Sequence, residues 1–384
     1  FDAKALVECV FPRDESQKAW VSAKEVLAMN AFDVALAGYV VDSNTGVSTL
    51  SALMERFAAA VLPEEEDTDK ALVLEVSAIA ALIDPLTQAL EEREVYTVYQ
   101  EIDAPLIGVL ACMERIGAAI DTDHLAMLSK DAGAEIERLR NAIYASAGRE
   151  FNIDSPKQLS EILFDEIGLK PIKKTQRGYS TDAKVLKELS SEHDLPQLVL
   201  EYREYAKIKS TYIDALPRMI AQDGRVHTSF NEMVTTTGRL SSSDPNLQNI
   251  PVRTEFGRNI RTCFVPLHEG EVFLSADYSQ IELRLLAHLS GDAHLIEEFC
   301  SGEDFHARTA SRVFGIPVED ITPELRSRAK AVNFGIVYGQ QAYGLAQSLD
   351  IPFYEAKEMI DRYFEAYPGV RHYLDDVVAQ AHEC

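Results

Sequence analysis

Residues 272–282 read Val-Phe-Leu-Ser-Ala-Asp-Tyr-Ser-Gln-Ile-Glu. An apolar run ends at Asp277, and leucines recur at helical spacing in 283–289. This pattern predicts a strand that leads into a carboxylate and then into an amphipathic helix. A carboxylate held rigidly at a strand end suits a hard cation such as magnesium. Judged alone, Asp277 is better explained as a cap of the next helix, but Gln280 and Glu282 beside it favour the cation site.

A second stretch, residues 326–344, carries a charged or aromatic residue at every fourth position, at Arg326, Lys330, Phe334 and Tyr338. On a helix such a row stays on one side. The two cations can hold a polyphosphate, and the two rings can pack on a sugar and a base. The alternative is that the rings belong to the core. Gly335 and Gly339 favour the functional interpretation, because helices seldom carry two glycines unless something approaches closely.

A third stretch, residues 237–253, is a polar segment rich in Arg, Asn and Gln. Such side chains suit contacts to phosphates and to base edges in the minor groove. Composition alone favours an ordinary surface loop.

The chain has 384 residues, which suggests two or three domains. Its net charge of −25 taken alone argues against nucleic acid, whose phosphates attract basic proteins. Acidic residues gather at 64–69 and 91–94, where a solvated loop and a solvated helix face are the simplest interpretation. Basic residues gather at 170–177 and 203–261. A chain polarised in this way can bind DNA with one face.

Five cysteines lie far apart and form no CxxC pair, which argues against a disulfide framework or a structural zinc site. A reducing, cytoplasmic setting fits best. We expect no segment apolar enough to span a bilayer and see no signal peptide. Because residue 1 is Phe rather than Met, we expect the numbering to be that of a fragment.

Hydrophobic periodicity predicts the elements coarsely. Mixed α/β structure is expected for residues 1–95, with short apolar runs such as 71–76. Helices are expected for most of 101–147, 195–219 and the residues after 278, and strands for 226–230 and 272–276. Ser155 followed by Pro156 predicts a capped helix start.

Together the three stretches resemble the family A DNA polymerases, the bacterial DNA polymerase I type. Residues 277–282 resemble the first palm motif, 326–339 the fingers helix, and 237–253 the palm motif that touches primer–template. Residues 155–159 and 209–212 resemble thumb segments, so the likeness extends over roughly residues 100–384.

The resemblance implies an α+β multidomain fold, in which an exonuclease-like α/β domain precedes a right-hand polymerase domain with mainly helical fingers and thumb. The expected boundaries are 1–95 for a degenerate 3′–5′ exonuclease-like domain, 96–225 for the thumb and connecting helices, 226–292 for the first part of the palm and 293–384 for the fingers. The expected partners are primer–template DNA and deoxynucleoside triphosphates, and the expected state is a cytoplasmic, nucleoid-associated monomer without membrane contact.

The family's residue roles can be carried over to matching positions. Asp277 would hold two magnesium ions, with the backbone carbonyl of Tyr278 as a further ligand. The nucleotide would be bound by Gln280, Glu282, His306, Arg326, Lys330, Phe334 and Tyr338. Among these, Lys330 would give a proton to the leaving pyrophosphate and Glu282 would exclude a 2′-hydroxyl. The duplex would be contacted by Arg239, Gln248, Asn249, Arg253, Lys207 and Lys209.

Two departures from the family pattern matter. The second palm carboxylate lies in a His-Asp-Glu tripeptide that does not occur here, and two-metal transfer needs two carboxylates. We therefore expect this chain alone, ending at Cys384, to lack polymerase activity. In the front domain, Asp33 resembles one exonuclease metal position, but the later Tyr and Asp motif has no match in the apolar run 72–83. We expect no proofreading and a structural Asp33.

The leading hypothesis is thus nucleotidyl transfer from a deoxynucleoside triphosphate to a primer 3′-hydroxyl. One alternative is a non-catalytic relic that grips DNA, against which the intact Asp277, Arg326 and Lys330 speak. Another is a related enzyme that makes RNA, against which Glu282 speaks. No GxxxxGK[ST] motif occurs, which excludes a P-loop NTPase as far as sequence allows.

Overall fold

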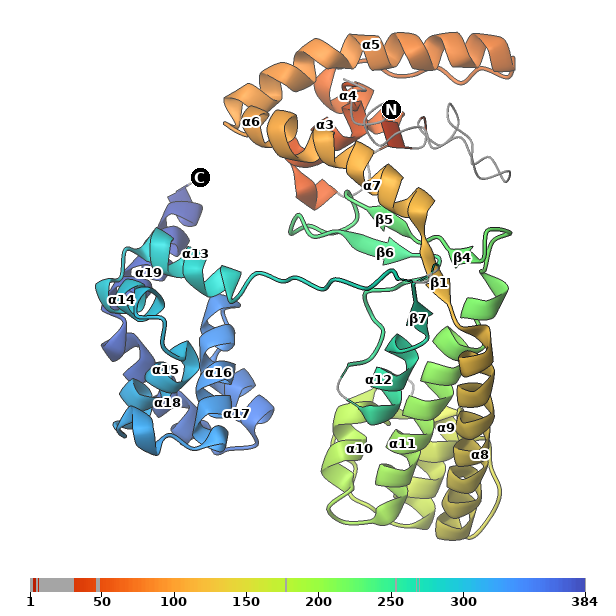
Figure 1. The fold of residues 1–384 in the computed structure, drawn as a ribbon, viewed down its shortest axis with the longest axis vertical. Coiled ribbons are helices and arrows are strands. Elements are labelled where there is room, and N and C mark those ends of the chain that lie inside the picture. Colours follow the sequence, from red (N-terminus) through yellow and green to blue (C-terminus); the bar gives the residue numbers. More distant parts are fainter. Residues whose placement is uncertain are drawn as a thin grey trace. The chain divides into compact units, whose positions relative to one another are not determined.

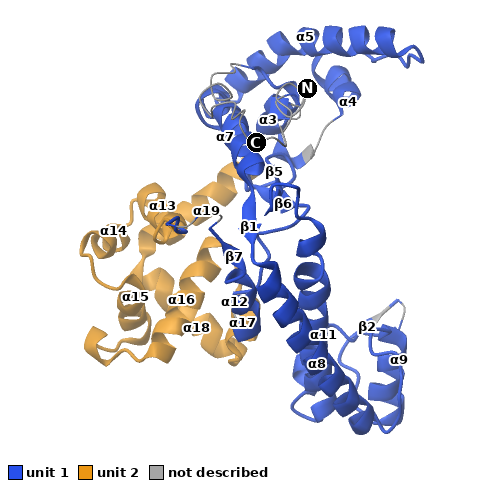
Figure 2. Cartoon of the chain, turned by 45° about the vertical axis from the view of Figure 1, so that its right-hand side comes forward, with its two compact units in different colours: residues 1–273 blue, residues 274–384 orange. Residues whose placement is uncertain are grey.

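The computed structural model describes residues 3, 4, 6, 31–45, 49–176, 178–252, 254–266, 268 and 270–383. The chain divides into two compact units, residues 1–273 and residues 274–384 (Figure 1, Figure 2). We refer to them as unit 1 and unit 2. The division falls inside the stretch 226–292 that the sequence assigned to the palm.

The front of unit 1 is built from helices. These are α3 (Val34–Val41), η1 (Ser43–Thr45), α4 (Leu50–Phe57) and α5 (Thr68–Glu92). Within the described part of residues 1–95 there is no strand, so the α/β prediction is wrong there. The reason is visible in α5, where residues four apart are buried: Ala78, Leu82, Leu86 and Leu90. The apolar run 71–76 opens this helical stripe, since its apolar residues continue into a period of four rather than two.

The expectation that no segment is apolar enough to span a bilayer does not hold for helix α5. Its 18-residue window has a mean hydropathy of 1.5, so by length and composition it could cross a membrane. Only 17% of this window is buried, and Leu72, Val73 and Val76 are exposed. One face of α5 packs on the core formed with α3 and α4.

The chain then enters a small antiparallel sheet. After α6 (Tyr96–Val98) and the π-helical turn η2 (Tyr99–Asp103), helix α7 (Ala104–Ile116) leads into the central strand. The strands run in the order β4 (Arg225–Val226), β1 (Ala118–Ile120) and β7 (Phe264–Val265). The short strand β1 therefore pairs with two segments that each lie more than a hundred residues further along the chain.

A helical subdomain follows β1. It contains α8 (Thr122–Ala147), α9 (Pro156–Ser160), η3 (Glu161–Glu166), α10 (Ala183–Leu189), α11 (Asp194–Ile208), η4 (Lys209–Ile213) and η5 (Leu216–Arg218). The predicted helix start is confirmed, because Ser155 Oγ accepts from the Gln158 amide at 3.4 Å and Pro156 opens α9. The basic segment 170–180 contains the hairpin β2 (Lys174–Thr175) and β3 (Gly178–Tyr179).

The last part of unit 1 holds a second hairpin, β5 (Ser229–Asn231) and β6 (Ser241–Ser243), and helix α12 (Glu255–Arg261). The strand predicted for 226–230 is split between β4 and β5. The strand predicted for 272–276 is wrong, since these residues are without regular structure. A strand needs a neighbour to pair its backbone groups, and none of the described strands lies against this segment.

In its described residues, unit 2 contains helices and no strand (Figure 2, orange). Its elements are α13 (Ile281–Ser290), α14 (Ala293–Cys300), α15 (Phe305–Phe314), η6 (Val318–Asp320), α16 (Pro323–Val337), α17 (Ala342–Leu349), α18 (Phe353–Ala366) and α19 (Pro368–Glu383). One core joins them, in which Tyr363, Tyr367 and Val370 are fully buried. The prediction of mostly helical structure after residue 278 is confirmed.

Candidate functional site

Helix α16 carries the row of cations and rings. Thr322 caps its start by accepting from the Leu325 amide at 3.2 Å, and Pro323 occupies its first turn. The helix ends at Tyr338, and Gly339 then adopts a φ of +67°, a left-handed conformation that favours glycine. The predicted helix is therefore present, with Tyr338 as its last capping residue rather than as part of its interior.

At the start of the row, Arg326 is held by the end of a neighbouring helix. Its Nε donates to Asp304 Oδ2 at 2.8 Å, and both side chains are nearly half exposed. Asp304 also caps α15 by accepting from the Ala307 amide. The guanidinium is thus oriented at the surface but keeps terminal N–H groups for an anion.

In the middle of the row, Lys330 is exposed and lies beside a ring. Its Nζ is 6.0 Å from the centroid of Phe334, within cation–π range. The Phe334 ring is half-buried, and its centroid is 6.0 Å from that of His306. The contacts place a cation, an aromatic face and an imidazole next to one another.

His306 lies on α15 and is 3% exposed. Burial, followed by the nearby positive charges of Arg326 and Lys330, lowers the pKa of His306 to about 4, against a weaker opposing effect of Asp304. The imidazole is therefore neutral at pH 7. Its Nε2 is 3.4 Å from the side-chain nitrogen of Gln280.

Gln280 and Glu282 begin α13. Gln280 is the N-cap in a left-handed conformation, with a φ of 54°. Glu282 Oε1 accepts a hydrogen bond from the phenolic oxygen of Tyr338 at 3.1 Å. The structure therefore brings together all seven residues that the sequence predicted for a nucleotide, within unit 2 alone.

Asp277 and Tyr278 precede α13 in an exposed segment without regular structure. An Asp carboxylate and a backbone carbonyl are oxygen ligands of the kind that magnesium takes. Among the described residues, however, no group of three or more His, Cys, Asp or Glu side chains lies close enough to hold a metal ion. The donors fit magnesium in kind but supply only part of a coordination shell.

The residues predicted to contact DNA lie in unit 1. Arg239, Gln248 and Asn249 are exposed in and beside the β5–β6 hairpin, and Gln248 Nε2 donates to Leu240 O at 3.1 Å. Arg253 falls outside the described residues.

The two lysines at the end of α11 that were predicted to contact DNA differ in exposure and in their partners. Lys207 is exposed, whereas Lys209 is half-buried and its Nζ lies 2.8 Å from both carboxylate oxygens of Asp214 and 2.7 Å from Ser129 Oγ. The Lys209 charge is therefore already neutralised within the protein, and Lys207 is better placed for a phosphate.

Asp33 is a helix cap. Its carboxylate is 3% exposed and accepts from the amides of Ala35, Leu36 and Ala3. Burial raises its pKa, which these hydrogen bonds only partly offset. An anion that is saturated with backbone donors in this way is a structural group.

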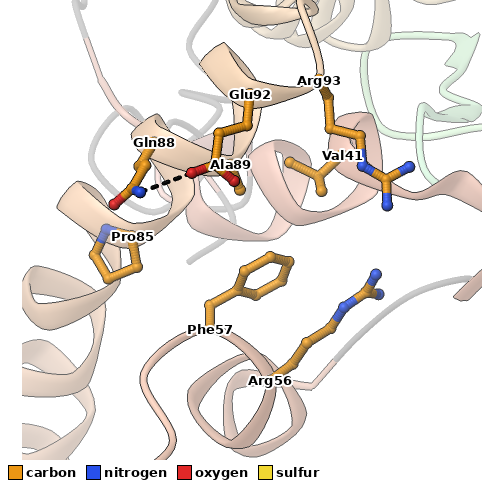
Figure 3. Close-up of a pocket in the computed structure, with 8 residues that line it drawn as sticks. All are labelled: Val41, Arg56, Phe57, Pro85, Gln88, Ala89, Glu92 and Arg93. Atoms are coloured by element: carbon orange, nitrogen blue, oxygen red, sulfur yellow. Dashed lines mark hydrogen bonds between the residues drawn. The ribbon is translucent and has the colours of Figure 1, made fainter.

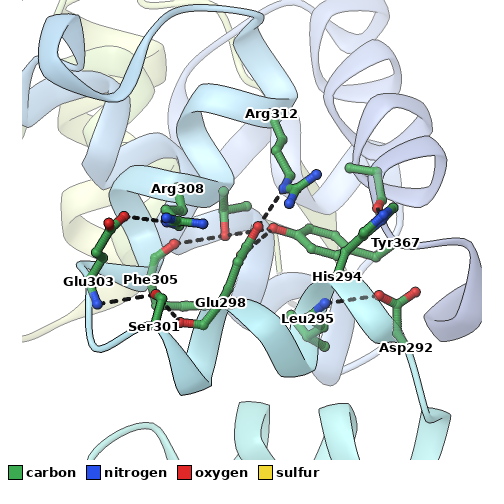
Figure 4. A network of polar contacts seen from close by, with 12 residues as sticks. Asp292, His294, Leu295, Glu298, Ser301, Glu303, Phe305, Arg308, Arg312 and Tyr367 are labelled. Carbon is green, nitrogen blue, oxygen red and sulfur yellow. Dashed lines mark hydrogen bonds and ion pairs between the residues drawn. The ribbon is translucent and has the colours of Figure 1, made fainter.

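Sequence reasoning missed several polar residues behind the row. Asn333 and Thr309 are fully buried, and Glu298 is 1% exposed. Figure 4 shows Glu298 between Arg312 and Tyr367, with Arg312 Nε at 2.5 Å and the Tyr367 hydroxyl at 2.7 Å. An Asn inside an otherwise well-formed helix was an available signal, because Asn disfavours helix interiors.

Two pockets lie away from these residues. One pocket of about 490 Å³ lies in the front of unit 1, where Gln88 donates to Glu92 beside Phe57 and Arg93 (Figure 3). Another of about 930 Å³ is lined by α9, η3, the β3 segment and Arg203. No residue predicted for nucleotide, metal or DNA lines either one.

A family model described as DNA polymerase family A matches residues 122–384. DNA polymerase I of Geobacillus stearothermophilus is 43% identical over 366 residues, which cover 91% of this chain and 42% of that protein. DNA polymerase I of Caldicellulosiruptor bescii is 47% identical over 355 residues, which cover 92% and 41%.

Among solved structures, the POL domain of Pol1 from M. smegmatis, in complex with DNA primer–template and dNTP, matches with a TM-score of 0.83. It is 43% identical, and the match covers 91% of this chain and 61% of that chain. The present chain spans about two fifths of the length of the curated relatives it matches.

Proposed function

Since this chain belongs to DNA polymerase family A, we propose that it forms part of a DNA-directed DNA polymerase active in DNA repair and replication. It would bind primer–template DNA and a deoxynucleoside triphosphate and add the nucleotide to the primer 3′-hydroxyl. The observation that carries this proposal is the convergence of Arg326, Lys330 and Phe334 on α16 with His306, Gln280 and Glu282 from two other helices.

The row on α16 would bind the triphosphate and nucleoside in order. Arg326 is oriented by Asp304 and can bind phosphate oxygens through its remaining N–H groups. Lys330 is a mobile point charge that can also give a proton to the departing pyrophosphate. Phe334 would pack on the sugar, and Tyr338 would lie at the insertion site. Glu282 would lie beneath the sugar and leave no room for a 2′-hydroxyl.

Asp277 and the carbonyl of Tyr278 would hold magnesium, with two ions in the assembled enzyme. When bound, magnesium offsets phosphate charge and favours ionisation of the attacking hydroxyl. A second carboxylate is needed beside Asp277, since the described residues offer no cluster of three candidate ligands. The activity is therefore proposed for the protein that supplies this group.

Duplex DNA would be held by unit 1 through Arg239, Gln248, Asn249, Arg253 and Lys207. Their side chains combine phosphate contacts with amide groups that can read minor-groove acceptors. The front helices would be a non-proofreading remnant of an exonuclease domain, with Asp33 as a structural cap. We further propose a monomer in the cytoplasm, associated with the nucleoid.

The decisive experiment is primer extension by the protein encoded by the full reading frame. We expect magnesium-dependent addition of deoxynucleotides, and its loss in Asp277→Asn. Asp376→Asn is a matched control, since Asp376 is an exposed carboxylate on α19 that pairs with His372. Tight primer–template binding without any extension would instead support the non-catalytic DNA-binding alternative.

A further inference from the structure

We propose that Asn333 is a positioning residue that fixes His306 in one tautomer, with its proton on Nε2 and with Nδ1 as an acceptor. The inference rests on the proposed function for its ligand, because the Nε2–H group would face a phosphate oxygen of the triphosphate. It assigns a role to a buried polar side chain that the nucleotide itself cannot touch.

Asn333 lies in the middle of α16 and is completely buried. Its Nδ2 is 3.1 Å from His306 Nδ1 and 3.2 Å from Thr309 Oγ1, both on α15. One amide nitrogen thus points both of its protons at the neighbouring helix, provided that both facing atoms accept.

Thr309 does accept. Its hydroxyl donates to the Phe305 carbonyl at 3.1 Å, one helical turn back. Its oxygen is therefore left as an acceptor toward Asn333. The Tyr367 hydroxyl also lies 3.4 Å from this oxygen, but it donates to Glu298 Oε2 over the shorter distance of 2.7 Å. Glu298 in turn accepts a hydrogen bond from Arg312, which holds the carboxylate in place (Figure 4). The Tyr367 proton therefore points at Glu298 and not toward Asn333.

Turning the Asn333 amide over, so that its Oδ1 and Nδ2 exchange places, would cost more free energy than the observed arrangement. It would point Oδ1 at His306 and Thr309 and turn Nδ2 to where Oδ1 now lies. Asn333 Oδ1 is buried there without a hydrogen-bond partner. Reversal would therefore leave two N–H donors unpaired in place of one acceptor. An unpaired buried donor costs about 1–3 kcal/mol, so the arrangement with Nδ2 toward His306 is the stable one.

The contact with Gln280 does not oppose this assignment. Gln280 is half-buried at the surface, and its amide can turn to present oxygen to the imidazole or to water. A proton on His306 Nδ1 would instead face the Asn333 amide protons in a buried site, with no solvent to relieve the clash. The buried partner therefore decides the tautomer.

This tautomer has a chemical consequence. Arg326 and Lys330 already bring two positive charges to the site, and Asp304 is the acidic group that faces it. A neutral Nε2–H adds a directional hydrogen-bond donor without a third charge. Burial that holds the pKa of His306 low supports the same state.

The test is nitrogen NMR of the chain labelled with ¹⁵N-histidine, with His306→Gln to assign the signal. At pH 7 and without nucleotide, we expect His306 to be protonated on Nε2 only. In Asn333→Asp the carboxylate accepts from Nδ1, so we expect the two nitrogen shifts to exchange character. Val332→Ala is the packing control, since Val332 is an equally buried neighbour on α16 and its loss leaves the tautomer unchanged.

A second variant keeps the idea testable if Asn333→Asp does not fold. Thr309→Val removes the acceptor that orients the amide, and we expect both tautomers to appear. A proton on Nδ1 in the unmodified chain, or an unchanged tautomer in Thr309→Val, would overturn the proposal. Because the spectra are recorded without nucleotide, an absence of primer extension would count against the proposed function only.

Discussion

The phenolic oxygen of Tyr338 donates to Glu282 Oε1 over 3.1 Å, which ties the end of α16 to the first turn of α13. One of these residues ends the row of cations and rings, and the other is the carboxylate proposed to lie under the sugar. The hydrogen bond therefore couples the proposed insertion site to the residue that we propose selects between ribose and deoxyribose.

We predict that Glu282→Ala admits ribonucleotides, because it removes the group that would occupy the space of a 2′-hydroxyl. Competition between deoxy- and ribonucleotides in primer extension measures the change. Tyr338→Phe is the matched control, since it removes only the hydroxyl that binds Glu282. Equal discrimination in Glu282→Ala and the unmodified enzyme would show that another residue selects the sugar.

Lys330→Ala should slow the chemical step strongly while primer–template affinity stays nearly unchanged. A general acid contributes typically about 10²–10⁴-fold, and that is the loss expected in single-turnover incorporation. Arg328→Ala is the control on the same helix, because Arg328 turns away from the row to Glu324 and Glu355. Normal single-turnover rates in Lys330→Ala would remove the proton-donor role.

Glu298 should be a major stabilising residue of unit 2. Glu298→Ala removes a buried carboxylate from both Arg312 and Tyr367, and breaking a buried pair costs about 3–5 kcal/mol. We expect the lower end, because Arg312 is one-third exposed and regains water. Urea denaturation gives the value, and Glu358→Ala, which breaks an exposed pair with Arg362, should cost under about 1 kcal/mol.

Because of His306, the free energy of unfolding should decrease in acid. Its pKa is about 4 in the folded protein against 6.5 for the ordinary group, so between these values only the unfolded chain takes up the proton. Stability therefore decreases as the pH is lowered from about 6.5 toward 4. Denaturant midpoints at pH 7 and pH 4.5 should diverge less in His306→Gln than in the unmodified chain; an identical pH dependence would contradict the low pKa.

Asp33→Ala should loosen the front helices without affecting any nuclease activity. The loss of an N-cap costs about 0.5–2 kcal/mol, and Asp33 also accepts from the Ala3 amide. Hydrogen exchange of the α3 amides should become faster in Asp33→Ala. Asp67→Ala, at the exposed N-cap of α5, should lower the free energy of unfolding less. A 3′-exonuclease activity that vanished with Asp33 would identify it as a metal ligand instead.

The sequence predicted the local part of the site well. A residue every fourth position from Arg326 to Tyr338 needed only the helical repeat to be placed on one side, and α16 has that repeat. Ser155 and Pro156 likewise located a helix start from neighbouring residues alone.

The non-local part could not be predicted in the same way. Asn333 lies 27 residues from His306, and Tyr367 lies 69 residues from Glu298, so their contacts exist only after α14, α15, α16 and α18 have packed. The strand expected at 272–276 failed for a related reason, because an apolar run becomes a strand only beside a partner strand. In α5, the short apolar run 71–76 was ambiguous by itself, and the helical period became clear only from the buried residues that follow it, Ala78 to Leu90.

The segment that precedes Asp277 has a practical consequence for work with this chain. Val272, Phe273 and Leu274 are 83%, 62% and 91% exposed, and no described strand pairs with their backbone. Extended apolar runs of this kind recruit other chains edge to edge. Self-association that rises with protein concentration, and a gain in solubility when Leu274 is replaced by lysine, are therefore to be expected during purification and storage.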